Sequence, residues 1–241
     1  MSLTICFCAY NEENNVEKCL DDAIKECGKE ANLEILVIDN ASTDRTPQVV
    51  QNYSKRDPRI QLVRHPENRF YSGSYRTALS RTKAEYTVIL DGDYQHTAKD
   101  IAAAINLMRE KNWDVLFGWK KSRHDGPARK LFSVGLRLIS QVLLGHKLHD
   151  INCGFRIFNR KSTNQIELKE VINSAGPEIF CECSRLGLNV GEMPVQHFAR
   201  TSGEGMHDSV WPLLKNTLKF LKYILHLRKR YRTEMIECRE S

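Results

Sequence analysis

Two carboxylates around a single glycine, Asp91 and Asp93 around Gly92, are the residues whose types and spacing most directly suggest chemistry. They follow the apolar run 86–90, which predicts a buried strand, and the glycine lets the backbone turn there. Carboxylate oxygens suit Mg²⁺ or Mn²⁺, and such ions usually take further oxygens from substrate phosphates. The motif therefore predicts a divalent-metal site, although a capped turn leading into the next helix would have the same sequence.

Two other apolar runs also end in polar side chains. Tyr10 and Glu12 follow the run 3–8, and Asp39 closes the run 33–38. Asp39 could accept hydrogen bonds from a uracil or guanine edge or from a ribose, and Tyr10 could stack on a base. The simpler interpretations are an Asx turn at Asp39 and an ordinary half-buried aromatic side chain at Tyr10.

The elements that would position these residues alternate between strand and helix. Apolar runs predict strands at 3–8, 33–38, 60–63, 86–90 and 115–118. Helical periodicity and start signals predict helices from 16, from 46, from 72 and at 98–111. Strands that are apolar on both faces indicate a mostly parallel α/β sheet covered by helices, in which ligands bind at the carboxyl ends of the strands. The three polar clusters should therefore meet at one rim.

The second half of the chain is less regular. It predicts a long apolar helix at 129–148, a loop and strand at 150–158, a helix at 177–188, a strand at 190–198, a Gly-rich loop at 200–208 and a helix at 211–232. No repeat, linker or low-complexity segment interrupts it. We expect one α/β domain at 1–208 and a C-terminal helical appendage at 209–241.

Composition places the chain among globular proteins. Of its 241 residues, 41% are hydrophobic and 27% are charged, which excludes disordered and fibrous classes. No apolar stretch is long enough to span a bilayer, and the N-terminus does not have the pattern of a signal peptide. The eight cysteines form no CxxC pair, which argues against structural zinc and favours buried thiols in a reducing compartment.

The positive charge is concentrated near the C-terminus. The net charge is +6, and seven bases without an intervening acid lie between Asp208 and Glu234. Such a segment suits anionic lipid or nucleic acid, but stacking aromatics are sparse there and no nucleic-acid partner is expected. The helix 211–232 is expected to be amphipathic and to lie on a membrane surface. The alternative is a helix packed on the domain with a solvated basic face.

Three ordered motifs resemble those of family 2 glycosyltransferases, which have the GT-A fold. They are Cys8-Ala9-Tyr10-Asn11-Glu12-Glu13, the segment from Val37 to Asp44, and Asp91-Gly92-Asp93-Tyr94-Gln95-His96. The run from Asp150 to Phe158, with Glu178, the segment 191–195 and the segment 200–204, resembles the dolichol-phosphate mannose synthase branch. This branch transfers a sugar from a nucleotide diphosphate sugar to a polyprenyl phosphate such as dolichyl or undecaprenyl phosphate.

The resemblance implies a role for each matching residue. It implies that the nucleotide sugar is bound by Ala9, Tyr10, Glu12, Asp39, Asp91 and Gly92. It implies that Asp93 and Gln95 bind Mg²⁺ or Mn²⁺, and that Arg129 and Arg200 hold phosphate groups. The sugar and acceptor end is implied to be shaped by Asp150, Arg156 and Glu178. We count Asp93, Arg200, Asp150 and Glu178 as the candidate catalytic residues.

Two departures from the family pattern concern the turn and the acceptor. Cys8 stands where proline is usual, and Gly203-Glu204-Gly205-Met206 lacks a lysine that normally helps to bind phosphate; His207 or Lys215 would have to replace it. A phosphate oxygen is already anionic near pH 7 and can attack without a strong base. The resemblance implies that this attack inverts the anomeric carbon. A sugar hydroxyl would need a strong base, with Glu178 or Asp150 as the candidate.

The expected protein is therefore a metal-dependent inverting hexosyltransferase, peripherally bound to the cytoplasmic face of a membrane directly or through a separate membrane subunit. The apolar helix at 131–144 is either a second membrane contact or a core helix. Two alternatives stay open. One is a family 2 glycosyltransferase that acts on a glycan or polysaccharide hydroxyl. The other is a non-catalytic, membrane-recruited protein that binds nucleotide sugars.

Overall fold

The computed structural model describes the backbone of residues 1–120, 127–198 and 210–240, and the side chains of these residues except 127–133, 210–216 and 233–240. Its strands are β1 Ser2–Ala9, β2 Asn32–Asp39, β3 Ile60–Arg64, β4 Tyr86–Asp91, β5 Val115–Lys120, β6 Arg156–Asn159 and β7 Val190–Val195. Its α-helices are α1 Val16–Cys27, α2 Thr46–Arg56, α3 Phe70–Arg81, α4 Ile101–Lys111, α5 Pro127–Leu144, α6 Arg160–Thr163, α7 Gly176–Arg185 and α8 Val210–Glu240. A 3₁₀ turn at Ala98–Asp100 precedes α4.

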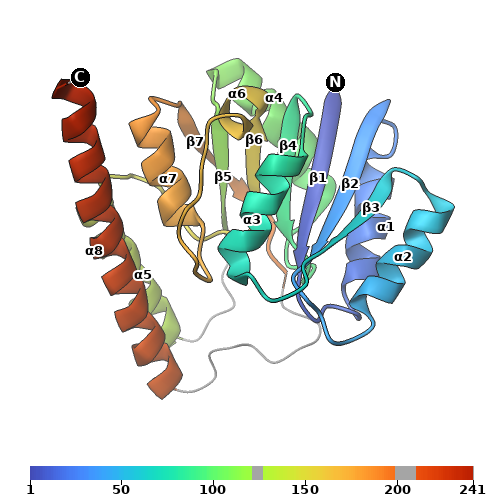
Figure 1. Ribbon diagram of the computed structural model, residues 1–241, viewed down its shortest axis with the longest axis horizontal. Coiled ribbons are helices and arrows are strands. Elements are labelled where there is room, and N and C mark those ends of the chain that lie inside the picture. The colour runs from blue at the N-terminus through green and yellow to red at the C-terminus, as the bar shows by residue number, and fades with distance from the viewer. Residues whose placement is uncertain (121–126, 199–209, 241) are drawn as a thin grey trace.

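Seven strands form one sheet in the order β3-β2-β1-β4-β6-β5-β7 (Figure 1). All neighbouring pairs are parallel except those of β6, which runs antiparallel to both β4 and β5. The expected mostly parallel α/β sheet is therefore confirmed. The carboxyl ends of β1, β2 and β4 meet at one edge, as the alternation of strand and helix predicted.

Each face of the sheet is covered by helices because the strands are apolar on both sides. Alternate residues of β1 divide between the two faces: Leu3, Ile5 and Phe7 pack with α1, α2 and α4, whereas Cys6 packs with α3 and α7. These two layers hold the polar strand ends in place from both sides. The seven cysteines of the described side chains are free thiols, as expected.

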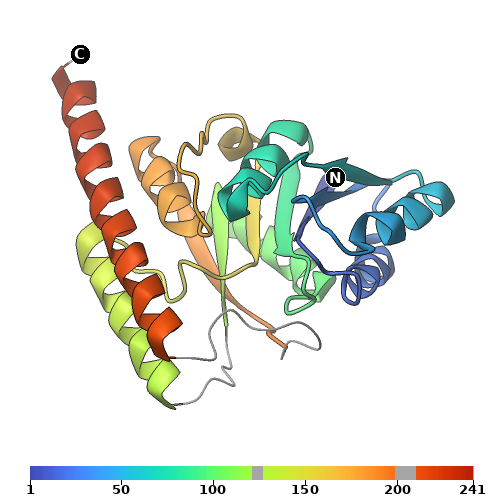
Figure 2. The same ribbon diagram turned by 60° about the horizontal axis from the view of Figure 1, so that its bottom comes forward.

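Helices α5 and α8 lie side by side at one end of the molecule in both views (Figures 1 and 2). Tyr223, Ile224, Leu227 and Tyr231 of α8 are buried against Cys181 of α7 and the end of α5. The C-terminal helix therefore has a packed face. In the described part of the chain, no helix combines the length and apolarity needed to cross a membrane.

Some element ends differ from the sequence prediction. Helix α5 ends at Leu144 rather than at 148, because Gly145 takes a left-handed conformation (φ 75°) that stops the helix. Strand β6 occupies only the end of the predicted 150–158 segment, and β7 ends at Val195 rather than 198. Helix α8 continues to Glu240, beyond the predicted end at 232.

Candidate active site

The strand register places the predicted site residues next to one another. Ala9 pairs with Asp39 across β1 and β2, and Cys8 pairs with Asp91 across β1 and β4. These pairs are the last rungs of their ladders, so Tyr10, Asn40 and Gly92 all leave the sheet at the same edge. The predicted convergence of the three polar clusters is present.

The loops at this edge share an uncommon backbone conformation. Asn11, Ala41, Phe70 and Tyr94 have positive φ values of 55°, 66°, 59° and 58°. Such conformations are uncommon outside glycine and cluster at functional sites, where the surrounding structure compensates for their strain. Asn11, Ala41 and Tyr94 lie in the loops after β1, β2 and β4, and Phe70 begins α3 after β3, which marks this edge as a constrained region.

Hydrogen bonds join the loop after β1 to the loop after β2. The Asn11 amide donates to Ser42 Oγ at 2.9 Å, and the Glu12 amide donates to Thr46 Oγ1 at 2.9 Å. The Glu13 amide donates to Asp44 at 3.1 Å. Burial alone would raise the pKa of Asp44, but hydrogen bonds from Thr46 and Glu13 lower it overall, so the carboxylate that ties these loops stays ionised.

The three nucleotide-pocket candidates of these loops differ in exposure. Tyr10 is 47% exposed, which leaves its ring free to meet a ligand. Ala9 is buried in the sheet, and Glu12 is buried with its Oε2 accepting a hydrogen bond from Asn15 Nδ2 at 2.7 Å. Glu12 therefore acts within this structure as an organiser of its own loop, whereas Tyr10 is the available contact.

Asp39 is fully buried at the end of β2, yet within the described part of the chain only one of its oxygens accepts a hydrogen bond. Its Oδ1 accepts from the Ser42 amide at 3.0 Å, which forms the turn. Its Oδ2 lies 3.1 Å from Arg64 Nε without hydrogen-bond geometry. Beside it lies an open cavity of about 490 Å³, lined by Ala41, Ser42, Thr43, Arg64, His65 and Pro66. Asp39 is not among the residues that line this cavity, whereas Arg64, its ion-pair partner, is.

Asp91 is held from two sides. Tyr71 of α3 donates a hydrogen bond to its Oδ1 at 2.5 Å. Its Oδ2 faces Gly154, where an added Cβ would lie only 1.9 Å away. Gly92 is similarly confined, since a Cβ there would lie 3.0 Å from the Cys8 carbonyl oxygen. The motif thus depends on close backbone approach at both glycines.

Asp93 and Gln95 supply the oxygen atoms expected of the metal site. The Gln95 amide donates to Asp93 Oδ1 at 3.1 Å, which holds the two side chains in one turn. Gln95 Nε2 donates to the Phe198 carbonyl at 3.3 Å, so the carboxamide oxygen is left as an acceptor. Among the described residues no cluster of three or more His, Cys, Asp or Glu could hold a metal. Two hard oxygen donors fit Mg²⁺ or Mn²⁺ that completes its coordination with substrate phosphate and water.

Asp150 lies in the loop before β6 and faces the same region. Burial lowers the pKa of His96, and the negative charges of Asp91 and Asp150 oppose this shift. His96 Nε2 lies 3.6 Å from Cys153 Sγ, and the pKa of that buried thiol is raised to about 12. The Cys153 amide donates to the Asp150 carbonyl at 3.3 Å, so the backbone of Asp150 belongs to the turn that contacts His96.

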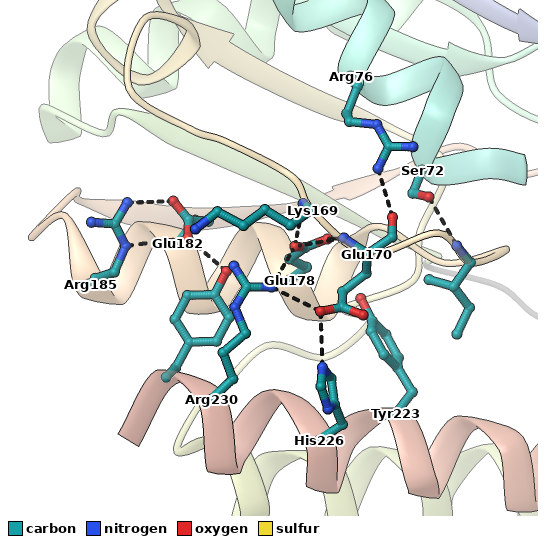
Figure 3. A network of polar contacts seen from close by, with 12 residues as sticks. Ser72, Arg76, Lys169, Glu170, Glu178, Glu182, Arg185, Tyr223, His226 and Arg230 are labelled. Carbon is teal, nitrogen blue, oxygen red and sulfur yellow. Dashed lines mark hydrogen bonds and ion pairs between the residues drawn. The ribbon is translucent and has the colours of Figure 1, made fainter. Parts of the chain in front are cut away.

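Glu178 belongs to a different environment (Figure 3). Its carboxylate is completely buried and accepts hydrogen bonds from the amides of Lys169 (2.7 Å) and Glu170 (3.1 Å). Arg230 of α8 lies 3.3 Å from the same carboxylate and 2.8 Å from Glu170. Glu178 has no exposed surface from which to reach an acceptor in this structure, and its partners give it a role in attaching α8.

Two predicted phosphate ligands lie outside the described side chains, since Arg129 is in the first turn of α5 and Arg200 lies between 199 and 209. Sequence reasoning missed Tyr71 and did not assign a role to Gly154. No sequence signal marks Tyr71, because its contact with Asp91 depends on how α3 packs on the sheet. Gly154 could have been noticed as the glycine of the 150–158 motif.

In mostly parallel α/β sheets, ligands bind at the carboxyl ends of the strands, which is where these acidic residues lie. The model of the family described as Glycosyl transferase family 2 matches residues 4–167, and the chain belongs to this family. This confirms the resemblance of the motifs.

Curated relatives name lipid-linked activities. The chain is 28% identical over 212 residues to "Dolichyl-phosphate beta-glucosyltransferase ALG5A" of Trichomonas vaginalis, covering 80% of this chain and 65% of the relative. It is 25% identical to "Dodecaprenyl-phosphate galacturonate synthase" of Rhizobium johnstonii, covering 84% of this chain and 61% of the relative. The chain thus spans less than two thirds of the length of both.

Solved structures share the fold. A mannosyltransferase of Pyrobaculum calidifontis, in complex with GDP-Man and Mn²⁺, superimposes with a TM-score of 0.64 at 18% identity. The match covers 98% of this chain and 75% of the other. The expected GT-A architecture is therefore confirmed.

Proposed function

We propose that this protein transfers a hexose from a nucleotide diphosphate sugar to a polyprenyl phosphate, with inversion at the anomeric carbon and with Mg²⁺ or Mn²⁺. The observation that carries the proposal is the meeting of Asp39, Asp91 and Asp93 at one strand edge in a family 2 chain. The lipid-phosphate relatives support the acceptor class. They name different sugars, so the proposal extends to UDP- or GDP-linked donors without choosing between them.

The proposed chemistry follows from the placement of the acids. Asp39 and Tyr10 would bind the nucleoside, Asp91 would contact its ribose side, and Asp93 with Gln95 would hold the divalent ion. When bound, this ion offsets the charge that develops on the leaving diphosphate. Arg129 and Arg200 would pair with phosphate groups, for which a guanidinium has the matching fork geometry.

The acceptor needs little activation. A lipid phosphate is anionic at neutral pH, so the protein has mainly to position two anions and screen their repulsion. A strong general base is then unnecessary. This agrees with the burial of Glu178, one of the two candidate bases. The other candidate, Asp150, acts electrostatically on His96, which follows the Asp91 motif in the chain.

Membrane contact through α5 and α8 forms part of the proposal. Both helices carry exposed apolar side chains, which are Val134, Leu138, Ile139 and Val142 on α5 and Leu218 and Leu225 on α8. Lys222 and Lys229 are also exposed. Helical spacing places them on the same side of α8 as Leu218 and Leu225, opposite the face that packs on α7 and α5. Apolar and basic side chains together suit an anionic bilayer surface. We place residues 1–208 as the catalytic unit and 209–241 as the membrane-facing segment on the cytoplasmic side.

The test is a transfer assay with the purified protein, Mn²⁺ or Mg²⁺, polyprenyl phosphate, and labelled UDP-glucose or GDP-mannose. We expect metal-dependent label in the lipid phase. Asp93→Asn should reduce the rate by about 100-fold or more, because it weakens the ion that stabilises the leaving group. Asp21→Asn, an exposed carboxylate of α1, is the matched control and should leave the rate unchanged.

Two results would contradict parts of the proposal. Donor hydrolysis or transfer to a sugar hydroxyl, without lipid product, would favour the glycan-acceptor alternative. Absence of donor binding would favour a non-catalytic role.

A further inference from the structure

Arg156 of β6 is a buried cation that the proposed chemistry does not use directly. It is 1% exposed, and its guanidinium lies between the rings of Tyr75 and Phe117, 5.2 Å from each centroid. Within the described side chains, no carboxylate lies at ion-pairing distance from it. A buried charge without a partner is strongly destabilising. Its presence in the core therefore calls for a compensating anion.

The hydrogen bonds of Arg156 lead toward Asp91. Arg156 Nη1 donates to Tyr75 Oη at 2.6 Å, and the hydroxyls of Tyr75 and Tyr71 lie 3.4 Å apart. Tyr71 then donates to Asp91 Oδ1 at 2.5 Å. Two tyrosines, one helical turn apart on α3, thus connect the cation to the carboxylate.

An arginine can only donate and a carboxylate can only accept, and each hydroxyl has one hydrogen. Tyr75 accepts from Arg156, and Tyr71 donates its hydrogen to Asp91 at 2.5 Å. The central contact of 3.4 Å also has Tyr71 on the donor side, so it is a weak second use of that same hydrogen. Burial raises the pKa of both tyrosines, so both hydroxyls remain protonated donors. Each bond in such a chain polarises the next.

Two glycines make room for the chain. A Cβ at Gly176 would lie 2.6 Å from Arg156 Nη2, and this nitrogen donates to the Ile151 carbonyl at 2.7 Å. A Cβ at Gly154 would collide with Asp91 Oδ2. Both ends of the chain therefore lie against backbone that admits no side chain. Asp91 has one orientation, set by Tyr71 on one side and by Gly154 on the other.

We propose that Arg156, Tyr75 and Tyr71 form a positioning relay that fixes the Asp91 carboxylate for donor binding. Asp91 is in turn the anion that compensates the buried Arg156. The inference rests on the proposed function, because it assigns the relay to the binding of a nucleotide sugar. None of the three relay residues needs to touch the donor.

The test measures donor binding by calorimetry, with UDP-glucose and GDP-mannose each in the presence of Mn²⁺. Tyr71→Phe removes only the hydroxyl that contacts Asp91, and we expect roughly a 10-fold or larger increase in donor Kd. Tyr75→Phe should raise the Kd in the same direction. In the double variant the second substitution should add little, since the relay is already interrupted.

The matched control is Tyr86→Phe. Tyr86 lies at the opposite end of β4, and its hydroxyl also accepts a hydrogen bond from an arginine, Arg109, at 3.3 Å. Its loss should leave donor Kd unchanged. Arg156→Lys keeps the charge and should bind donor better than Arg156→Met.

Thermal unfolding of each variant separates positioning from general stability. A lower melting temperature with an unchanged Kd in Tyr71→Phe would overturn the relay, as would fully additive effects of the two tyrosine substitutions. If the wild-type protein bound neither donor, the proposed function would fail, and the relay with it. If the wild-type protein bound donor and the variants matched it, only the relay would fail.

Discussion

At the scale of single residues, the site depends on carboxylates that are confined by neighbouring backbone and side chains. Asp91 and Gly154 come from segments more than sixty positions apart, yet a single methyl group at Gly154 would overlap the Asp91 carboxylate. Asp39 is buried, and one of its oxygens has no hydrogen bond from the residues that the structure describes. These features point to carboxylates held in fixed orientations for a ligand.

Gly154→Ala tests this confinement. The new Cβ would lie 1.9 Å from Asp91 Oδ2, so the carboxylate must move, and we expect donor affinity to fall by about 10-fold or more. Calorimetric titration with a nucleotide sugar and Mn²⁺ measures the change. Gly135→Ala on α5 is the control, because a Cβ there meets nothing within 4 Å. Equal donor affinities in the two variants would contradict the close contact.

At the scale of elements, α8 is attached to the rest of the molecule by both apolar and charged contacts. Tyr231 donates to Glu182 at 2.7 Å. Arg185 pairs with the same carboxylate, also at 2.7 Å (Figure 3). Nearby, Arg76 of α3 donates to the Glu170 carbonyl at 2.8 Å. The loop before α7 therefore joins α3 to α8.

Arg230→Met should weaken this attachment. It removes the arginine that pairs with the buried Glu178, while Glu170 keeps His226 at 3.1 Å. Removing one partner of a buried ion pair costs about 3 kcal/mol of unfolding free energy. Urea denaturation gives the difference. Arg228→Met, an exposed position on the same helix, should change it by under about 0.5 kcal/mol. The double variant Arg230→Met with Glu178→Gln should recover part of the loss; no recovery would argue against the pairing.

His146, just after α5, gives the fold a pH dependence. Burial lowers its pKa to about 4, and its Nδ1 accepts a hydrogen bond from the Leu148 amide at 3.2 Å. A histidine with a lowered pKa stabilises the fold when neutral, so its contribution is complete above about pH 6.5 and is lost as the pH falls toward 4. We expect the unfolding free energy to fall by on the order of 2 kcal/mol across this range.

The substitution His146→Asn isolates that contribution from those of other histidines. Asparagine offers an acceptor in place of Nδ1 but does not titrate. Denaturation at pH 7 and pH 4.5 should show a smaller pH effect in the variant than in the wild type. Identical pH effects would exclude His146 as the source.

At the scale of the whole molecule, the nucleotide edge and the α5–α8 pair are separate parts of one body. Helices α5 and α8 lie at one end, and α1 and α2 lie at the other (Figure 1). The exposed apolar side chains of α5 and α8 are therefore remote from the cavity that Arg64 lines. This arrangement suits an enzyme that takes one substrate from solution and the other from a membrane surface.

Lys222→Gln with Lys229→Gln should reduce binding to anionic vesicles. Each base near such a surface contributes to attraction, so we expect vesicle affinity to fall by roughly 10-fold for the pair, with the difference shrinking at high salt. Co-sedimentation with vesicles containing phosphatidylserine measures this. The control pair, Lys29→Gln with Lys55→Gln, removes two exposed lysines from the α1–α2 end. Similar losses in both pairs would show that net charge, and not this surface, governs binding.

The sequence by itself determined the sheet, its order of strand and helix, and the edge where the acids meet. Parallel strands that are buried on both faces must be continuously apolar, so they can be recognised in the sequence as apolar runs. The polar residues that follow these strands lie at the same edge of the sheet. The position of Asp91 and Asp93 at a strand end follows from the same local pattern, whereas the 47% exposure of Tyr10 is known only from the structure. What local pattern could not show was the antiparallel insertion of β6 between β4 and β5.

Only the tertiary structure decided what the buried polar residues do. Arg156 and Glu178 looked alike as polar members of site motifs. Packing joins Arg156 to Asp91 through two tyrosines of α3 and joins Glu178 to Arg230 of α8. Those partners are separated by 50 or more positions along the chain, and a buried charge takes its role from whichever group lies next to it. The physical reason is that long-range contacts carry no local periodicity, whereas strands, helices and their ends do.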